Sequence, residues 1–508
     1  MVASLLKVIS TGIQDERLHF SPTLYPFVKT WIHAGRCTTK WHRLDFYNPA
    51  TFGNTAFFKL PRKGHLITRL YLVATMPDIY TTQKQALQQL QQTVPNATQV
   101  FPRFGWTNSL GHALVSQLTL DIAASRVETL DSRLLEILDE FNTPLEKVPG
   151  INELICRKDN GFTETSFGWP PTQPSQQPVM QQVIVPLPFW FTRGDPGNAL
   201  PIDAMSMDEV RVGITFRTLN GLYYTPTHVE NTSTADGTSL YPIANSTFYA
   251  QDPIQHPGQQ PLANQNGVIM MPPLQLGDCH VMAEYVYLDQ NEANRFRLAD
   301  IQVPVVQHYA MNPFDTRGLM NAQIRLDIPN PTRDLFFMCN PVMAPSYNAH
   351  FLATNTLTGT EHSVPSSAQL PWWPDAVGLL DTVFIRPGFA LSNAEPVSGY
   401  ELNYQGSLVR FRTEGPALFR SIVPSFEQRK SPWVNRYYYN IPMGIENGLT
   451  PFSRPQGEAN LDKITNRDLV ITFKGYGTNV NQFMVYVYAE TYNMLRIYGG
   501  RAGCMFAY

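Results

Sequence analysis

The sequence predicts an all-β protein built from two tandem β-sandwiches, and three observations predict this class. The chain has 508 residues, enough for two or three domains. It contains 41 prolines, 23 tyrosines and 29 phenylalanines but only 16% charged residues, a composition that favours strands and turns over helical bundles. Short apolar or alternating runs, separated by glycine and proline turns, occur in two sets that one short helix divides.

The strand pattern is clearest around residue 200. Residues 183–191 are nearly all apolar, and so short a run predicts a strand buried on both faces. Pro186 and Pro188 confine that strand to an edge or a bulge, because proline cannot donate to a β-ladder. Residues 193–198 are a dense turn signal, and residues 210–217 alternate between apolar and polar side chains. The segment therefore predicts strand, long turn and strand, with nothing arranged for chemistry.

Three other features mark the first half. Residues 57–76 predict two strands separated by a basic turn at residues 61–64, which we interpret as a solvated hairpin tip rather than a phosphate contact. Residues 131–141 predict a helix with Asp131 as its N-cap, because the leucines and the phenylalanine that follow share one face. The polar stretch 219–266 predicts a long surface loop or insertion.

The second half repeats the strand pattern after a divider. Residues 281–288 predict a strand and residues 290–298 a short polar helix. Further strands are predicted at residues 323–328, 334–339, 408–412, 437–441, 469–473 and 483–489. We therefore expect an N-terminal arm (1–30), a first sandwich (31–289, with the insertion at about 219–266), a linking helix (290–299) and a second sandwich (300–508).

Composition also excludes several functions. The formal net charge is −3, so we expect no direct nucleic-acid binding. No run of about 18 apolar residues predicts a membrane span, and the N-terminus lacks a signal-peptide pattern. The cysteines are odd in number and scattered, which predicts a fold that needs no disulfide and a reducing compartment. They are Cys37, Cys156, Cys279, Cys339 and Cys504.

Several short motifs occur in an order typical of one family. They are LPRKGHL (60–66), NSLGHAL (108–114), LPFWF (187–191) with PGNALP (196–201), EYVYLD (284–289) and YNMLRI (492–497). In these motifs the chain resembles the major capsid proteins of nucleocytoplasmic large DNA viruses, which include the phycodnavirus, iridovirus and asfarvirus proteins. His65 stands where that family usually has an acid. Residues 1–30 and 219–266 have no counterpart in the family pattern.

The resemblance implies a fold and a role. The fold would be two tandem eight-stranded jelly-roll sandwiches with short helices and long surface loops. Homotrimers of near-hexagonal outline would tile an icosahedral shell, so the protein would be made in the infected cell and located in the virion. Expected partners are neighbouring capsomers, minor capsid or cement proteins and penton proteins. The arm at residues 1–30 would contact an internal viral membrane, and residues 219–266 would face outward.

A trimer would explain aromatic residues in turn-rich segments. Exposed aromatics would form large apolar patches on a monomer, whereas at subunit interfaces they act as anchors. We expect this role for Trp372, Trp373, Trp433 and the tyrosines at 437–439.

No catalytic residue or cofactor site is expected. Three residues are spaced like metal ligands, but no fourth ligand is near, so we expect no metal: His33, Cys37 and His42. Asp203, Asp208 and Glu209 could suggest an acid pair, but we expect Glu209 to pair with an arginine on a strand face. Three sequons are candidate glycosylation sites: Asn96, Asn231 and Asn245.

Two alternatives to a major capsid protein stay open. Within the same family, the chain could be a minor double jelly-roll component of the shell. In a different class, an aromatic-rich β-sandwich could bind or cleave carbohydrate. Such an enzyme should bring a pair of carboxylates together in one groove.

Overall fold

The computed structural model describes fourteen parts of the chain. They are residues 37–77, 105–157, 182–193, 196–230, 238–243, 275–342, 344–354, 395–405, 408–413, 416, 418–432, 436–444, 457–474 and 482–506. The predicted arm, the three sequons and the three tryptophans expected at an interface lie outside these residues.

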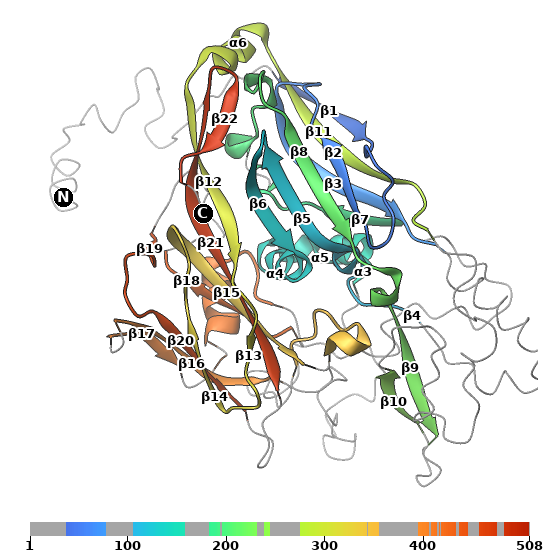
Figure 1. Ribbon diagram of the computed structural model, residues 1–508, viewed down its shortest axis with the longest axis vertical. Coiled ribbons are helices and arrows are strands. Elements are labelled where there is room, and N and C mark those ends of the chain that lie inside the picture. Colours follow the sequence, from blue (N-terminus) through green and yellow to red (C-terminus); the bar gives the residue numbers. More distant parts are fainter. Residues whose placement is uncertain are drawn as a thin grey trace, which may run out of the picture.

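The first jelly roll consists of two four-stranded antiparallel sheets (Figure 1). One sheet has the order β1 (Cys37–Leu44), β11 (Cys279–Leu288), β3 (Leu66–Thr75), β7 (Gln182–Pro186). The other has the order β2 (Thr55–Lys59), β8 (Val210–Phe216), β5 (Val115–Ile122), β6 (Ser125–Asp131).

The second jelly roll repeats this plan. One sheet has the order β12 (Ile301–Ala310), β21 (Phe483–Tyr498), β15 (Pro331–Pro341), β18 (Tyr438–Pro442), with β13 (Phe314–Asp315), β19 (Ala459–Asn460) and β22 (Arg501–Cys504) at its margins. The other has the order β14 (Asn321–Arg325), β20 (Asp468–Phe473), β16 (Val397–Tyr404), β17 (Leu408–Thr413). When the eight main strands of each set are numbered along the chain, both sets have the sheet orders 1-8-3-6 and 2-7-4-5. The predicted double jelly-roll fold is confirmed.

Five α-helices and one hairpin complete the described fold. The helices are α3 (Leu110–Leu114), α4 (Ser132–Asn142), α5 (Val148–Leu154), α6 (Gln290–Leu298) and α7 (Val423–Glu427). Helix α6 lies at one end of the molecule, and β9 (Tyr223–Glu230) and β10 (Thr238–Ile243) form a hairpin near the other, beside the short β4 (Gly105–Trp106) (Figure 1). Among the described residues, no helix has the length and apolarity to cross a membrane.

Local sequence signals explain two of these elements. Asp131 caps α4 as predicted, because its Oδ1 accepts a hydrogen bond of 2.7 Å from the backbone N–H of Leu134. Strand β7 lies at the edge of its sheet, which is where a strand ending in Pro186 can be accommodated. The predicted strand over 183–191 is shorter than expected, since it ends at Pro186 and a 3₁₀ turn (Trp190–Thr192) follows.

Three sequence predictions were wrong in detail. Residues 61–64 are not a hairpin tip, because β2 pairs with β8 while β3 pairs with β11 and β7, so the turn crosses between the two sheets. The stretch 219–266 is not wholly loop, since its β-branched and aromatic residues form β9 and β10. The tyrosines at 437–439 are buried within the subunit, because β18 packs both of its faces.

Candidate functional site

The second jelly roll turns one sheet face toward the first. Phe337 stacks on Tyr439 at 4.6 Å and meets Tyr400 of the opposite sheet at 5.2 Å, so its side chain faces the core of its own sandwich. Side chains alternate along a strand, so Phe336 points the other way, and its ring lies 5.3 Å from Phe141 of α4. We call the side of a sheet that faces away from its own sandwich core its outer face. The outer face of β12-β21-β15-β18 therefore packs on the first jelly roll.

Polar contacts continue this interface across β21. The hydroxyl of Tyr488 donates to Asp131 Oδ2 at 2.7 Å. The guanidinium of Arg133 lies 4.1 Å from the centre of the Tyr486 ring. Both contacts come from the end of β6 and the start of α4, so the connection after β6 covers the face.

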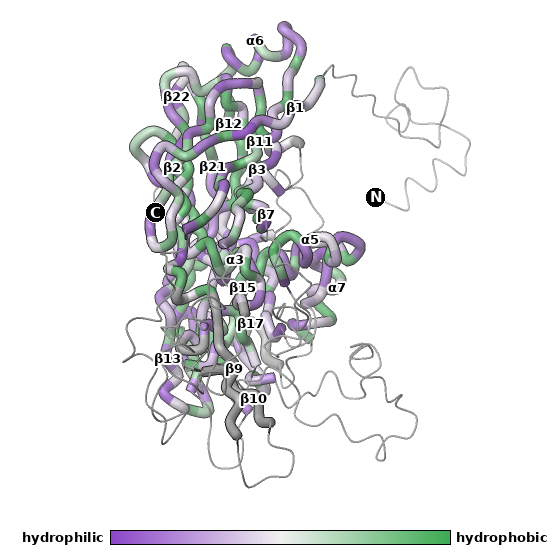
Figure 2. The backbone as a smooth tube through the Cα atoms, turned by 90° about the vertical axis from the view of Figure 1, so that its right-hand side faces the viewer, coloured by the Kyte–Doolittle hydropathy of each residue, from purple (hydrophilic) through white to green (hydrophobic). Residues whose placement is uncertain are grey.

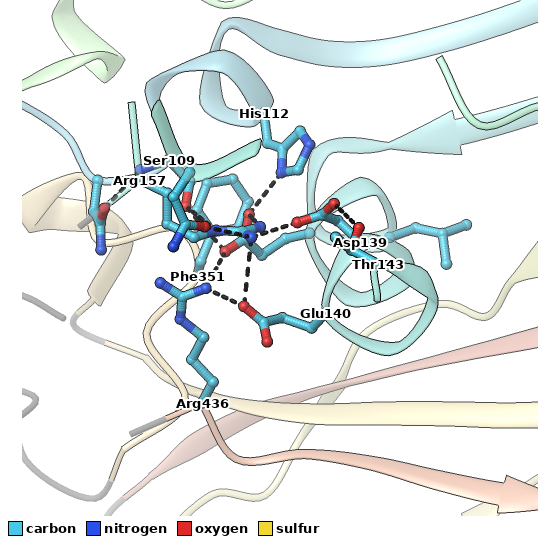
Figure 3. A network of polar contacts seen from close by, with 12 residues as sticks. Ser109, His112, Asp139, Glu140, Thr143, Arg157, Phe351 and Arg436 are labelled. Carbon is cyan, nitrogen blue, oxygen red and sulfur yellow. Dashed lines mark hydrogen bonds and ion pairs between the residues drawn. The ribbon is translucent and has the colours of Figure 1, made fainter. Parts of the chain in front are cut away.

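A buried ionic group, which we call the α4 cluster, lies within this interface (Figure 3). Glu136 and Glu140 are one helical turn apart, so both project from the same side of α4. Arg157 Nη2 lies 2.6 Å from Glu136 Oε2, and the same guanidinium also contacts Asp139. His112 Nδ1 lies 2.6 Å from the same Glu136 oxygen. The first jelly roll thus supplies three carboxylates and one arginine.

The second jelly roll supplies two further cations to the α4 cluster. Lys430 Nζ lies 2.8 Å from Glu140 Oε2, and Arg436 contacts the other oxygen of that carboxylate. Arg436 Nη1 also lies 3.6 Å from Glu136 Oε1. All of these side chains are buried. Three carboxylates therefore face three cations, and ion pairs to Glu140 and Glu136 cross between the jelly rolls.

The cations decide the protonation of these carboxyl groups. Burial alone would raise the pKa of Glu140, but Arg436, Lys430 and Arg157 outweigh it and lower the pKa to about 2. Burial would likewise raise the pKa of Glu136, yet the nearby arginines hold it well below its usual range. Both groups are therefore anions at neutral pH.

A second buried group, the His308 cluster, lies between β6 and β12. His308 Nδ1 lies 2.5 Å from Glu128 Oε1, and its Nε2 lies 3.1 Å from Glu490 Oε1. Arg193 of the first jelly roll lies 2.7 Å from the same Glu490 oxygen, and Arg333 Nη1 is 4.0 Å from the other. Burial opposes ionisation of Glu490, but these cations lower its pKa well below its usual range. This cluster also joins both jelly rolls.

These clusters fix the relative position of the jelly rolls more than they add stability. A buried ion pair is costly to desolvate, and replacing one by apolar residues is often neutral or stabilising. Removing a single partner is different, because it leaves an uncompensated charge in the interior. An interface held by such clusters tolerates one arrangement, which suits a rigid building block.

The structure does not bring together the residues that are spaced like metal ligands in the sequence. His33 lies outside the described residues, and Cys37 is exposed at the start of β1. His42 Nε2 lies 2.7 Å from the hydroxyl of Tyr287. Burial, Lys63 and Lys40 lower the pKa of His42. In the part of the chain that the structure describes, no group of three or more histidine, cysteine or acidic side chains could hold a metal.

Separate partners bind the three acidic residues from which the sequence could suggest an acid pair. Asp203 accepts from Arg297 of α6 at 2.7 Å, and Asp208 accepts from a backbone amide of β22 at 2.7 Å. Glu209 pairs with Lys59 on the neighbouring strand at 3.0 Å, so the expectation of an arginine partner was wrong.

Sequence reasoning missed the two clusters. One signal was present, because His308 and Glu490 each interrupt an apolar strand run, and a charge there requires a buried partner. Glu136 and Glu140 gave no such signal, since two acids one turn apart look like the solvated side of an amphipathic helix.

Comparisons with known proteins agree with this fold. Residues 42–289 match the family described as "Major capsid protein N-terminus". The chain is 20% identical to the major capsid protein of Phaeocystis pouchetii virus over the full length of both chains. It is 21% identical to the major capsid protein of Frog virus 3 (isolate Goorha), over 90% of this chain and 87% of the other.

A solved structure shares the architecture. A chain of the quasi-atomic PBCV-1 virus capsid aligns with a TM-score of 0.64 at 16% identity, covering 95% of this chain and 100% of the other. Residues 42–289 thus match the major capsid protein family, and the whole chain is similar in sequence to major capsid proteins of large DNA viruses. The solved structure shows that the double jelly-roll fold is shared.

Proposed function

We propose that the chain is a structural subunit of an icosahedral virus shell and that it acts as a homotrimer. The observation that carries this proposal is the repeated jelly roll, locked by two buried ionic clusters into one rigid pair. Three such pairs present six similar walls around a centre, which gives a near-hexagonal outline. The relatives carry the name major capsid protein, which supports the same role and a location in the virion.

Finer parts of this role extend the proposal. Residues 31–289 and 300–508 would be the two folding units, joined by the helix at 290–299. The subunit would have no catalytic activity and no cofactor, and it would not bind nucleic acid. It would contact neighbouring capsomers, cement and penton proteins, and its arm at residues 1–30 would reach an internal membrane. The sequons at Asn96, Asn231 and Asn245 stay candidate glycosylation sites.

Gel filtration with multi-angle light scattering tests the oligomeric state. We expect three times the 57.4 kDa mass of one chain. Negative-stain images should then show particles of near-hexagonal outline. A monodisperse monomer at micromolar concentration would contradict the proposal and revive the carbohydrate-binding alternative. The abundance of the protein in purified virions separates a major from a minor component of the shell.

A further inference from the structure

The first jelly roll has a sheet face equivalent to the one that the second jelly roll buries. In its β1-β11-β3-β7 sheet, Leu70, Leu72, Val281 and Ala283 belong to the core. By alternation Tyr71 and Met282, which are cross-strand partners, lie on the outer face.

Trp41 lies on the same outer face, because it pairs with Glu284, two residues along from Met282. Its ring is 5.7 Å from that of Tyr71. Trp41 is 40% exposed, and Tyr71 and Met282 are half-buried. On the equivalent face of the second jelly roll, Phe336 and Tyr488 are 1% exposed. An aromatic face that is covered in one jelly roll is therefore open in the other.

The element that covers the closed face also has an equivalent. The first jelly roll covers it with the connection between its fifth and sixth strands, β6 and β7, where α4 lies. In the second jelly roll the same connection, between β17 and β18, contains a π-helical turn (Leu418–Ile422) and α7. This pair of turns projects from one side of the molecule (Figure 2).

The second connection exposes an apolar stripe. Leu418, Ile422 and Phe426 are 41%, 52% and 69% exposed. They are spaced four residues apart, so they follow one side of the helical segment. Apolar side chains concentrated on one helical side are typical of a surface that another protein covers.

We propose that this stripe packs on the outer β1-β11-β3-β7 face of a second copy of the chain, at Trp41, Tyr71 and Met282. The inference rests on the proposed homotrimer and assigns its contact. Within the chain, the connection after the fifth strand of one jelly roll covers the outer face of the next jelly roll. The same packing between the second jelly roll of one copy and the first jelly roll of another would be a head-to-tail contact. Such contacts can close into a ring. Contacts inside subunits then alternate with similar contacts between them.

Three variants of the full-length chain test both sides of the contact. The double variant Ile422→Glu/Phe426→Glu charges the stripe, and Trp41→Glu charges the opposing face. Leu298→Glu is the matched control, because Leu298 is 88% exposed on α6, outside both surfaces. At a concentration where the wild-type chain is trimeric, we expect the first two variants to run as monomers and the control as a trimer, each retaining its wild-type far-ultraviolet circular dichroism.

Hydroxyl-radical footprinting of the wild-type trimer gives a readout that needs no substitution. Trp41, Met282 and Phe426 should be oxidised several-fold less than their exposure in one chain predicts. Met207 and Tyr498, which are 74% and 67% exposed and lie away from both surfaces, should stay reactive.

The outcomes separate this inference from the proposed function. A wild-type trimer in which both charged variants stay trimeric, or in which Phe426 or Trp41 is oxidised as readily as Met207, overturns the contact and leaves the homotrimer intact. If only one of the two charged variants becomes monomeric, the pairing of the stripe with this face is overturned. A monomeric wild-type chain overturns the homotrimer itself.

Discussion

The two jelly rolls differ most on a face where their topology is the same. The outer face of β12-β21-β15-β18 is buried and carries charged groups, among them His308 and Glu490. The equivalent face of the first jelly roll is partly open, and its ion pairs, such as Arg43 with Asp278, are half exposed. Strand order therefore does not decide what a face carries. The element that packs on a face decides which side chains the face carries, because a charge can be buried only where a specific partner meets it.

The largest expected effect comes from removing one charge of the α4 cluster. Glu140→Ala leaves Lys430 and Arg436 buried without that carboxylate, so we expect the free energy of unfolding to fall by about 3–5 kcal/mol. Glu209→Ala breaks the half-exposed pair with Lys59 and should cost less than about 1 kcal/mol. Urea unfolding of both variants measures the difference. Equal losses in the free energy of unfolding would show that a charge of the buried cluster matters no more than one of an exposed pair.

A comparison of aromatic residues on the two equivalent faces sharpens the contrast. Phe336→Ala creates a cavity against Phe141, and we expect a loss of about 3–5 kcal/mol. Trp41→Ala removes a ring that is already 40% exposed in one chain, so its loss should be clearly smaller in the monomeric protein. Both variants can be made in the monomeric Ile422→Glu/Phe426→Glu background and compared by urea unfolding. If Trp41→Ala costs as much as Phe336→Ala, the two faces are equally covered within one chain.

Acid should loosen the buried interface. The folded pKa of Glu140 is lowered to about 2, so its contribution is present above its ordinary pKa of 4.5 and is lost as the pH falls toward 2. A pKa shift from 4.5 to about 2 corresponds to a contribution of about 3 kcal/mol to the free energy of unfolding at neutral pH. Thermal unfolding between pH 6 and pH 3 should show a smaller loss of stability in Glu140→Gln than in the wild-type chain. Parallel curves for the two proteins would count against this carboxylate as a source of acid sensitivity.

The smallest expected effect lies at the turn between β21 and β22. Gly500 has a φ of +81°, and an added Cβ would lie 2.2 Å from Ser206 Oγ of the first jelly roll. Gly500→Ala should therefore cost about 1 kcal/mol or somewhat more. Gly503→Ala is the control, since no atom lies within 4 Å of its added Cβ. Differential scanning calorimetry should show a lower melting temperature for the first variant only.

Much of the fold could be predicted because local patterns carry it. Alternation identified β8 and β14, and a capping aspartate located α4. Strands β1, β12 and β16 were missed, since glycine, proline and polar residues interrupt their runs. The fold class followed from the motifs together with the strand sets, and the structure added the pairing that no local pattern contains.

The buried clusters could not be predicted for a different reason. Glu140 meets Lys430 and Arg436, which lie almost 300 residues further along the chain. No spacing rule connects positions so distant. The strand at 437–441 was predicted, but its tyrosines were expected at a subunit interface because prolines and a tryptophan lie nearby. They are buried within the chain instead, with Tyr438 and Tyr439 on opposite faces of β18.

Strand β21 has a consequence for how the chain is synthesised. It lies between β12 and β15 in its sheet, yet it is among the last strands to leave the ribosome. Residue 483, where β21 begins, follows the end of β12 at residue 310 by 173 residues. At a translation rate of about 5–20 residues per second, β21 is synthesised roughly 9–35 s after β12. During that interval the unpaired edge of β12 is open to other nascent chains. A cell that makes many copies of this chain at once therefore benefits from a chaperone that holds β12 until translation ends.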